Sequence, residues 1–272
     1  MSEWNAMTFE GKDTILRVVQ QEAEQFYALA EAPGAWTAPT ACAEWEVRDA
    51  VGHIVDTIEG YFPAFDAARG TAEDKPSAGL PAMAERANAG AKALSDLPQD
   101  ELMDRLRSDQ QKLMEMLQSL GADDWTGLMA THPYMGPVPA FFYAAGQLMD
   151  FGVHSWDIRQ GTGRAHGLSG DAADLLVPFM FALWQGTVRQ DRDTTPFQLG
   201  IRVTSGHNAG DTRVTVDENG MAYEQGSVDD LPAVLEFDAG SLVLTTFGRS
   251  NAGTVRGDQS VADRYLNLFF RI

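Results

Sequence analysis

The stretch MDFGVHSWDIR, from Met149 to Arg159, places an acidic residue and a histidine one helical turn apart. Asp150 precedes His154 by four residues and Asp157 follows three residues later, so a helix would carry all three side chains on one stripe. A carboxylate and an imidazole at this spacing can bind a metal ion. They can equally form the polar edge of a packed helix. The spacing alone leaves both interpretations open.

The sequence around this stretch, up to about residue 165, has the apolar periodicity of helices. Pro63 is expected to end the second helix, and Pro98 to interrupt the third helical region. The Gly- and Pro-rich stretch 131–140 is expected to be a loop. Four long helices with one or two long crossings would form an up-down bundle. The expected helical segments are 13–32, 47–62, 81–97, 101–120 and 140–160.

The sequence changes character after about Gly167. An amphipathic helix is expected within 169–190, and a closing helix over 260–272. Strand-like runs lie between them at 197–205, 212–226 and 233–249, with turn signals DENG and DAGS. The prediction is therefore a mixed fold: a four-helix bundle over residues 1–166, then a small α+β domain with a mostly antiparallel sheet over 167–272.

Composition limits the function. With 272 residues, 44% of them hydrophobic, the chain can form one large or two ordinary domains. A net charge of −19 argues against nucleic acid and against an anionic membrane surface as partners. The single cysteine rules out an intrachain disulfide, and neither a signal-peptide pattern nor a long apolar span is present. We expect a cytoplasmic protein. The oligomeric state cannot be read from the sequence.

His53 resembles His154 in its setting, because each lies inside an expected helix at the rim of its apolar face. If the two helices face each other, His53, Asp150 and His154 meet at one point. Three protein ligands leave coordination positions open, which is typical of catalytic metal sites. Spacing cannot show that His53 faces the other two. Histidines in expected loops are treated as surface residues: His132, His166 and His207.

Two stretches together resemble the DinB-like, mycothiol-dependent maleylpyruvate isomerase family. The first is WTAPTACAEWEVRDAVGHIVD, residues 36–56, and the second is DFGVHSWDIRQGTG, residues 150–163. The stretch GSLVLTTFGRSNAGTVRGD, residues 240–258, is similar to the small sterol-carrier-like domain of that family. In the first stretch the matching residues are Trp36, Cys42, Trp45, Val47, Arg48, Asp49 and His53.

The resemblance implies a divalent metal, usually zinc, held by His53, Asp150 and His154, with mycothiol as cosubstrate and a small electrophile as substrate. This chain has Asp150 where many members have Glu, and the shorter side chain bears on which divalent metal is preferred. Glu46 stands where relatives carry Thr or Ser as a helix cap, and Glu caps poorly. Asp49 is therefore expected to bond back to the backbone at the helix start.

A dicarboxylate electrophile would need a cation, for which Arg249 is the first candidate and Arg159 the second. Asp157 either orients His154 or pairs with Arg48. Cys42 is expected to be a packed core residue.

Three functions remain open. The same metal site could serve an isomerase or a mycothiol S-transferase. A non-catalytic protein that binds a metal or an apolar ligand is the third possibility.

Overall fold

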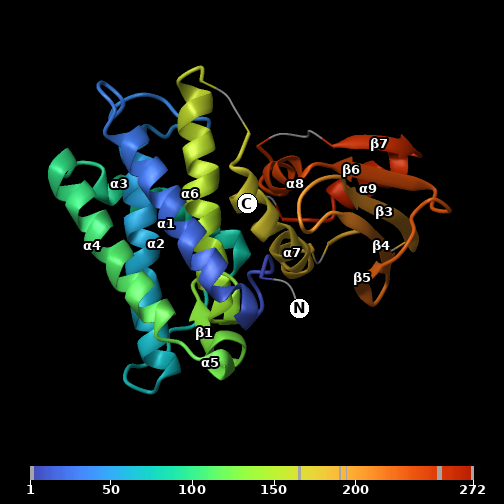
Figure 1. The fold of residues 1–272 in the computed structure, drawn as a ribbon, viewed down its shortest axis with the longest axis horizontal. Coiled ribbons are helices and arrows are strands. Elements are labelled where there is room, and N and C mark those ends of the chain that lie inside the picture. Colours follow the sequence, from blue (N-terminus) through green and yellow to red (C-terminus); the bar gives the residue numbers. More distant parts are fainter. Residues whose placement is uncertain (1–2, 165–166, 190, 194, 250–252, 271–272) are drawn as a thin grey trace. The chain divides into compact units, whose positions relative to one another are not determined.

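The computed structural model describes residues 3–164, 167–189, 191–193, 195–249 and 253–270. It divides into two compact units, Met1–Leu168 and Ser169–Ile272, which we call unit 1 and unit 2 (Figure 1). Unit 1 is largely helical and unit 2 combines helices with a sheet, which confirms the predicted fold class. His166 lies outside the described residues. No helix in the described part of the chain is both long and apolar enough to cross a membrane.

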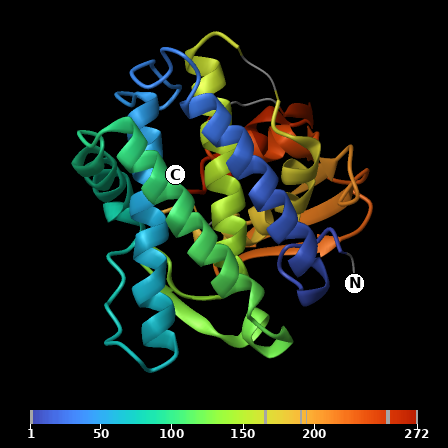
Figure 2. The same ribbon diagram turned by 60° about the vertical axis from the view of Figure 1, so that its left-hand side comes forward.

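Four long helices form unit 1: α1 (Lys12–Ala30), α2 (Val47–Ala68), α4 (Gln99–Gln118) and α6 (Phe141–Gly161). Helices α1 and α2 each contact both α4 and α6, so α4 and α6 lie across the bundle from each other (Figure 2). Each helix buries its apolar face in the shared core. Shorter elements complete the unit: η1 (Phe9–Gly11), η2 (Leu80–Ala82), α3 (Met83–Leu94) against α2, and α5 (Ala122–Gly127).

Two expectations about the secondary structure of unit 1 are wrong. Helix α2 does not end at Pro63 but continues to Ala68. Proline removes one backbone donor, while the turn that follows still buries Phe65 in the core. The stretch expected to be a loop is a hairpin of β1 (Met129–His132) and β2 (Gly136–Pro139). A two-stranded hairpin tolerates prolines because each strand has an edge that needs no partner.

Lys12 fastens the end of α4 to the start of α1. Its side chain is almost fully buried, and Nζ donates to the carbonyl oxygens of Gln118 and Leu120, each at 2.6 Å. Gln118 is the last residue of α4 and Leu120 lies two residues beyond it, where backbone acceptors have no partner within the helix. The ammonium also lies 6.0 Å from the ring centroid of Trp125.

We expect Lys12→Met to lower the free energy of unfolding of unit 1 by about 2 kcal/mol. Methionine keeps the apolar stem but leaves two buried carbonyls without their charged donor. Urea unfolding followed by helical circular dichroism measures the change. Lys75→Met, at an exposed lysine, is the control and should have almost no effect. Equal stability of the two variants would contradict the capping role.

Unit 2 is built on a five-stranded sheet in the order β5-β4-β3-β6-β7. Only the pair β3–β6 is parallel, so the expected, mostly antiparallel sheet is confirmed. The strands are β3 (Phe197–Val203), β4 (Gly210–Asp217), β5 (Gly220–Gln225), β6 (Ala233–Phe237) and β7 (Thr254–Gly257). The helices of this unit are α7 (Gly170–Gly186), α8 (Ala239–Thr246) and α9 (Gln259–Leu266).

The segment 233–249 is strand-like only in its first part, because β6 is followed by helix α8. The turn signal DAGS is in fact a helix start: the Asp238 carboxylate accepts a hydrogen bond from the Ser241 backbone N–H at 2.8 Å. Leu242 and Thr246, one turn apart, are both buried. A well-formed cap and a buried helical stripe therefore outweigh the high β-propensity of the segment. Strand β7 was not expected.

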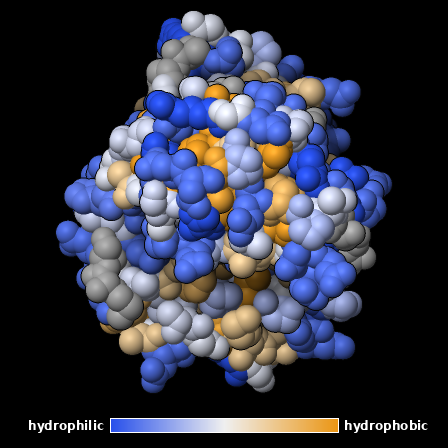
Figure 3. All heavy atoms as spheres, turned by 90° about the vertical axis from the view of Figure 1, so that its right-hand side faces the viewer, coloured by the Kyte–Doolittle hydropathy of each residue, from blue (hydrophilic) through white to orange (hydrophobic). Residues whose placement is uncertain are grey.

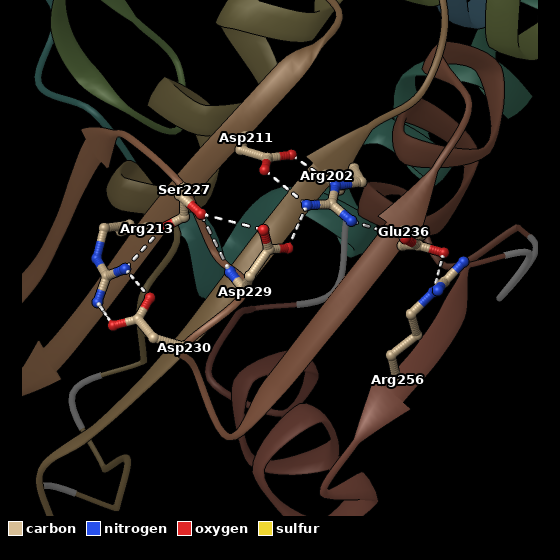
Figure 4. Close-up of polar contacts among 8 residues, drawn as sticks. All are labelled: Arg202, Asp211, Arg213, Ser227, Asp229, Asp230, Glu236 and Arg256. Carbon is tan, nitrogen blue, oxygen red and sulfur yellow. Dashed lines mark hydrogen bonds and ion pairs between the residues drawn. The ribbon is translucent and has the colours of Figure 1, made fainter.

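The polar face of the sheet carries a network of ion pairs (Figure 4). Arg202 on β3 binds Asp211, Asp229 and Glu236, with the closest contact, to Asp211, at 2.7 Å. Arg256 on β7 shares Glu236. The arginines are thus paired with acidic neighbours and do not form a basic patch here. Hydrophilic residues cover most of the face drawn in Figure 3, with hydrophobic ones between them in patches.

Candidate metal centre

The three predicted ligands meet inside unit 1. His53 comes from α2, while Asp150 and His154 come from α6, and their ligand atoms all lie within 4.8 Å of one another. The two imidazole rings are 5.1 Å apart between centroids and nearly perpendicular. Asp150 and His154 are each 7% exposed. Two imidazoles and one carboxylate are a donor set that suits Zn²⁺ and similar divalent ions, so the residues fit a metal.

The start of α2 fixes the position of His53. The Glu46 backbone N–H donates to Asp49 Oδ2 at 2.8 Å, as expected from the poor capping ability of glutamate. Lys92 on α3 binds the same carboxylate oxygen at 2.7 Å. Ile54 and Ile58 are fully buried in the core, which sets the rotation of α2 about its axis. His53, beside Ile54, therefore reaches the interior edge that α6 faces.

Asp157 contacts the ring nitrogen of His154 that points away from the cluster. Its carboxylate is fully buried, with Oδ2 3.0 Å from His154 Nδ1. This contact leaves Nε2 of His154 for a metal. A histidine that binds a metal through one ring nitrogen commonly hydrogen-bonds to a carboxylate through the other. Arg48, the alternative partner for Asp157, pairs with Glu46 at 2.8 Å.

The expectation that Cys42 is a packed core residue is wrong. It is half-buried, and its thiol donates to Asp157 Oδ2 at 3.0 Å and lies 4.0 Å from His154 Nδ1. The loop that carries Cys42 is bound to α6, since the Ala41 N–H donates to the Asp157 carbonyl at 2.9 Å. A Cβ at Gly161 would lie 2.2 Å from the Pro39 carbonyl oxygen, so only glycine permits this approach. Sequence spacing cannot reveal a loop that folds back onto a distant helix.

Trp45 is a second residue that the spacing argument missed. Its ring centroid lies 5.1 Å from that of His53 and 5.7 Å from that of His154. The indole N–H donates to Asn88 Oδ1 on α3 at 2.9 Å, which holds the ring in place. Trp45 therefore packs against both imidazoles. The sequence could have indicated Trp45 as a site residue, because it belongs to the same motif as His53.

Burial and hydrogen bonding act in opposite directions on the pKa values of the two candidate ligands of α6. Burial raises the pKa of Asp150 to about 6, although His154 opposes the shift. Burial alone would lower the pKa of His154, but the hydrogen bonds with Asp157 and Cys42 outweigh it and raise this pKa to about 10. His154 is therefore protonated at neutral pH without a metal. Metal binding has to release that proton.

The two candidate arginines lie in different units, and Arg159 on α6 has a partner outside this cluster. Arg159 Nη2 donates to Gln25 Oε1 on α1 at 3.3 Å, so it is directed along α1. Arg249 belongs to unit 2, where it follows α8 and Nη1 donates to the Phe247 carbonyl at 3.2 Å. A role of either arginine in binding a substrate stays a prediction.

His132 is not the surface residue that its loop-like sequence predicts, whereas His207 is exposed as expected. His132 lies on β1 with its ring 5.4 Å from Phe142 between centroids. Its Nδ1 accepts hydrogen bonds from the backbone N–H groups of Tyr134 at 3.2 Å and Met135 at 3.3 Å. Burial lowers the pKa of His132 to about 4. The hairpin thus depends on a neutral imidazole.

We expect acid to destabilise unit 1 through His132. The pKa is near 6.5 in the unfolded chain and about 4 in the folded one, so below pH 6.5 protons bind the unfolded chain more readily. Stability present above pH 6.5 is therefore lost as the pH falls towards 4, with about 2 kcal/mol lost between pH 7 and 5. His132→Asn, whose Oδ1 can accept the same bonds, should lack this loss in urea unfolding. His207→Asn should retain it, and identical pH profiles for all three proteins would refute the assignment.

Unit 1 is thus a four-helix bundle with a candidate metal centre between two of its helices. Residues 19–159 match the sequence profile of the mycothiol maleylpyruvate isomerase N-terminal domain. This match spans more than half of the chain and contains all three candidate ligands. The chain therefore belongs to the mycothiol maleylpyruvate isomerase family.

Among solved structures, the chain is similar to the crystal structure of the mycothiol-dependent maleylpyruvate isomerase. The TM-score is 0.60 at 14% sequence identity, and the likeness covers 90% of this chain and 93% of that one. A mutant of that enzyme with one histidine replaced by alanine gives a TM-score of 0.59 at the same identity and coverage. At such identity the likeness establishes a shared fold. No curated protein sequence matches the chain.

Proposed function

We propose that the protein is a metal-dependent enzyme that uses a low-molecular-weight thiol, mycothiol, to isomerise a small electrophile in the manner of a maleylpyruvate isomerase. The observation that carries the proposal is the convergence of His53, Asp150 and His154 within 4.8 Å. Three protein ligands are the number that leaves room for a substrate on a catalytic metal. Membership of the family supports the choice of thiol.

Each residue of the site has a task in this proposal. His53, Asp150 and His154 would hold a divalent ion, with zinc as first choice, and Asp157 would keep the His154 ring in one orientation. When bound, such an ion lowers the pKa of a thiol so that thiolate is available at neutral pH. Trp45 covers the two imidazoles and limits the access of water. The proposal includes a cytoplasmic location.

The reaction follows from thiol chemistry. The sulfur adds to one carbon of the cis double bond of maleylpyruvate, which turns that bond into a single bond. Rotation about it, followed by expulsion of the same thiol, gives the trans isomer, fumarylpyruvate. The thiol is regenerated. Arg249 remains our first candidate for contacting a substrate carboxylate, and Arg159 the second.

An S-transferase is the alternative that the same residues support. A site that provides a thiolate can also open an epoxide or displace a leaving group, and the thiol then stays on the product. The two reactions differ in whether thiol is consumed. A metal-binding protein without catalytic activity is the remaining possibility.

The test combines metal content with thiol chemistry. We expect the purified protein to contain about one divalent ion, and His53→Ala to contain almost none. The matched control, His207→Ala, changes an exposed histidine of unit 2 and should keep the metal. Maleylpyruvate with catalytic mycothiol should give fumarylpyruvate, followed by absorbance. Stoichiometric loss of mycothiol with an epoxide would instead indicate the transferase. Metal binding without either reaction would reject the enzyme proposal.

A further inference from the structure

Gln147 lies on α6 on the same face as the candidate ligands. It precedes Asp150 by three residues and His154 by seven, so the three side chains follow one stripe of the helix. Gln147 is fully buried, whereas Asp150 and His154 are each 7% exposed. The carboxamide therefore occupies the deeper end of the stripe, about one helical turn inside the metal centre.

The Gln147 carboxamide has no hydrogen-bond partner among the described residues. Both its Nε2 and its Oε1 are buried without one. Buried amide groups are almost always hydrogen-bonded, because an unpaired one is costly to remove from water. A Cβ at the preceding Gly146 would lie 3.3 Å from the Tyr61 phenol oxygen. Tyr61 comes from α2, the helix that carries His53, so α2 packs against α6 at Gly146 as well as beside the candidate ligands.

These observations favour a small ligand with an oxygen acceptor. Gln147 is fully buried, so we expect a bulky thiol to enter instead where His53 and Trp45 are partly exposed. The neighbouring charged group is the carboxylate of Asp150. The neutral N–H donor of Gln147 can bind an acceptor oxygen of the ligand without burying a further charge. The small electrophile, not the thiol cosubstrate, fits this position.

We infer that the Gln147 carboxamide donates a hydrogen bond to the carbonyl or carboxylate oxygen conjugated to the double bond of the electrophile. The inference rests on the proposed function. As the C–S bond forms, the electron pair of the double bond moves onto this oxygen as an enolate. After rotation the pair returns, the double bond forms again and the C–S bond breaks. Gln147 thus faces the atom on which negative charge develops, where a preorganised donor has its largest effect.

Gln110 on α4 provides a matched control. It is also almost fully buried, and its carboxamide atoms also have no partner among the described residues. Helix α4 carries none of the candidate ligands. The competing explanation for both glutamines is structural, namely a shared buried water inside the bundle. Gln147→Leu and Gln110→Leu remove the same group with little change in shape, so the two explanations predict different results.

The experiment measures binding and turnover on the metal-loaded full chain. The saturated analogue of maleylpyruvate, which cannot add a thiol, is titrated by calorimetry. We expect Gln147→Leu to weaken its binding about tenfold and to lower kcat/KM for maleylpyruvate roughly 100-fold, as loss of one oxyanion donor does. Metal content should be unchanged, and thermal stability equal or higher, because an apolar isostere replaces an unpaired amide. Gln110→Leu should leave binding and kcat/KM unchanged.

The outcomes separate this inference from the proposed function. If the wild-type protein binds the analogue through Gln147 but turns over no maleylpyruvate, the inference stands and the proposed reaction fails. If the wild type is active and both leucine variants match it in binding and kcat/KM, the inference is overturned and the reaction stands. Failure of the wild type to bind the analogue also overturns it.

Discussion

Asp150→Asn is expected to lose the metal and, with it, turnover. The substitution keeps the shape of the side chain but replaces a charged ligand oxygen with a weakly binding amide. Removing a residue that only hydrogen-bonds to a metal ligand lowers metal affinity about 10–100-fold. Removing the ligand itself should therefore lower metal affinity by more than about 100-fold. Competition with a chromophoric chelator measures the affinity directly.

Two further variants serve as controls for Asp150→Asn. Asp109→Asn changes another buried carboxylate of the bundle, which pairs with Lys112 on α4 outside the cluster, and should keep the metal. Asp150→Glu keeps a charged carboxylate at this position and should bind metal. If Asp150→Asn binds the metal with a Kd close to that of the wild type, Asp150 is not a ligand.

Asp157→Ala should weaken metal binding about 10–100-fold while the three ligands stay in place. The carboxylate holds His154 through Nδ1 at 3.0 Å, and without it the ring can rotate and change tautomer. The same chelator competition measures the loss, and circular dichroism checks that the bundle is folded.

Cys42→Ala separates the two hydrogen bonds of Asp157. It removes the thiol contacts with Asp157 at 3.0 Å and with His154 Nδ1 at 4.0 Å, but leaves the bond between Asp157 and His154 in place. A thiol is a weak donor, so metal affinity should stay within a factor of about three of the wild type. If Cys42→Ala lowers metal affinity as much as Asp157→Ala does, the thiol rather than the carboxylate controls the orientation of the His154 ring.

The helices and the shared stripe of the candidate ligands Asp150 and His154 could be predicted, because local sequence pattern determines both. Apolar periodicity located the four long helices, and the i, i+4 spacing of Asp150 and His154 needs only that α6 is a helix. The continuation of α2 past Pro63 could not be predicted in this way, because the burial of Phe65 that favours it depends on neighbouring helices. The start of α8 was missed because Asp238 can begin either a turn or a helix.

The grouping of the candidate site residues could be predicted only for those that lie on helices. His53 could be paired with α6 only through the resemblance to a family, since spacing says nothing about which helices face each other. Gln147 precedes Asp150 by three residues, so the sequence could have indicated it as a member of the same helical stripe. Cys42 could not, because its position depends on a loop that crosses to the far end of α6.

That loop contact has a consequence for how the chain tolerates change. Surface loops usually accept insertions at little thermodynamic cost. The loop before α2 differs, because the backbone of Pro39 lies against Gly161 and the Ala41 N–H is bonded to the carbonyl of Asp157. Its length therefore sets where Cys42 and Trp45 lie relative to the histidines. Lengthening this loop by even one residue would therefore act on the candidate metal centre, although none of the candidate ligands is altered.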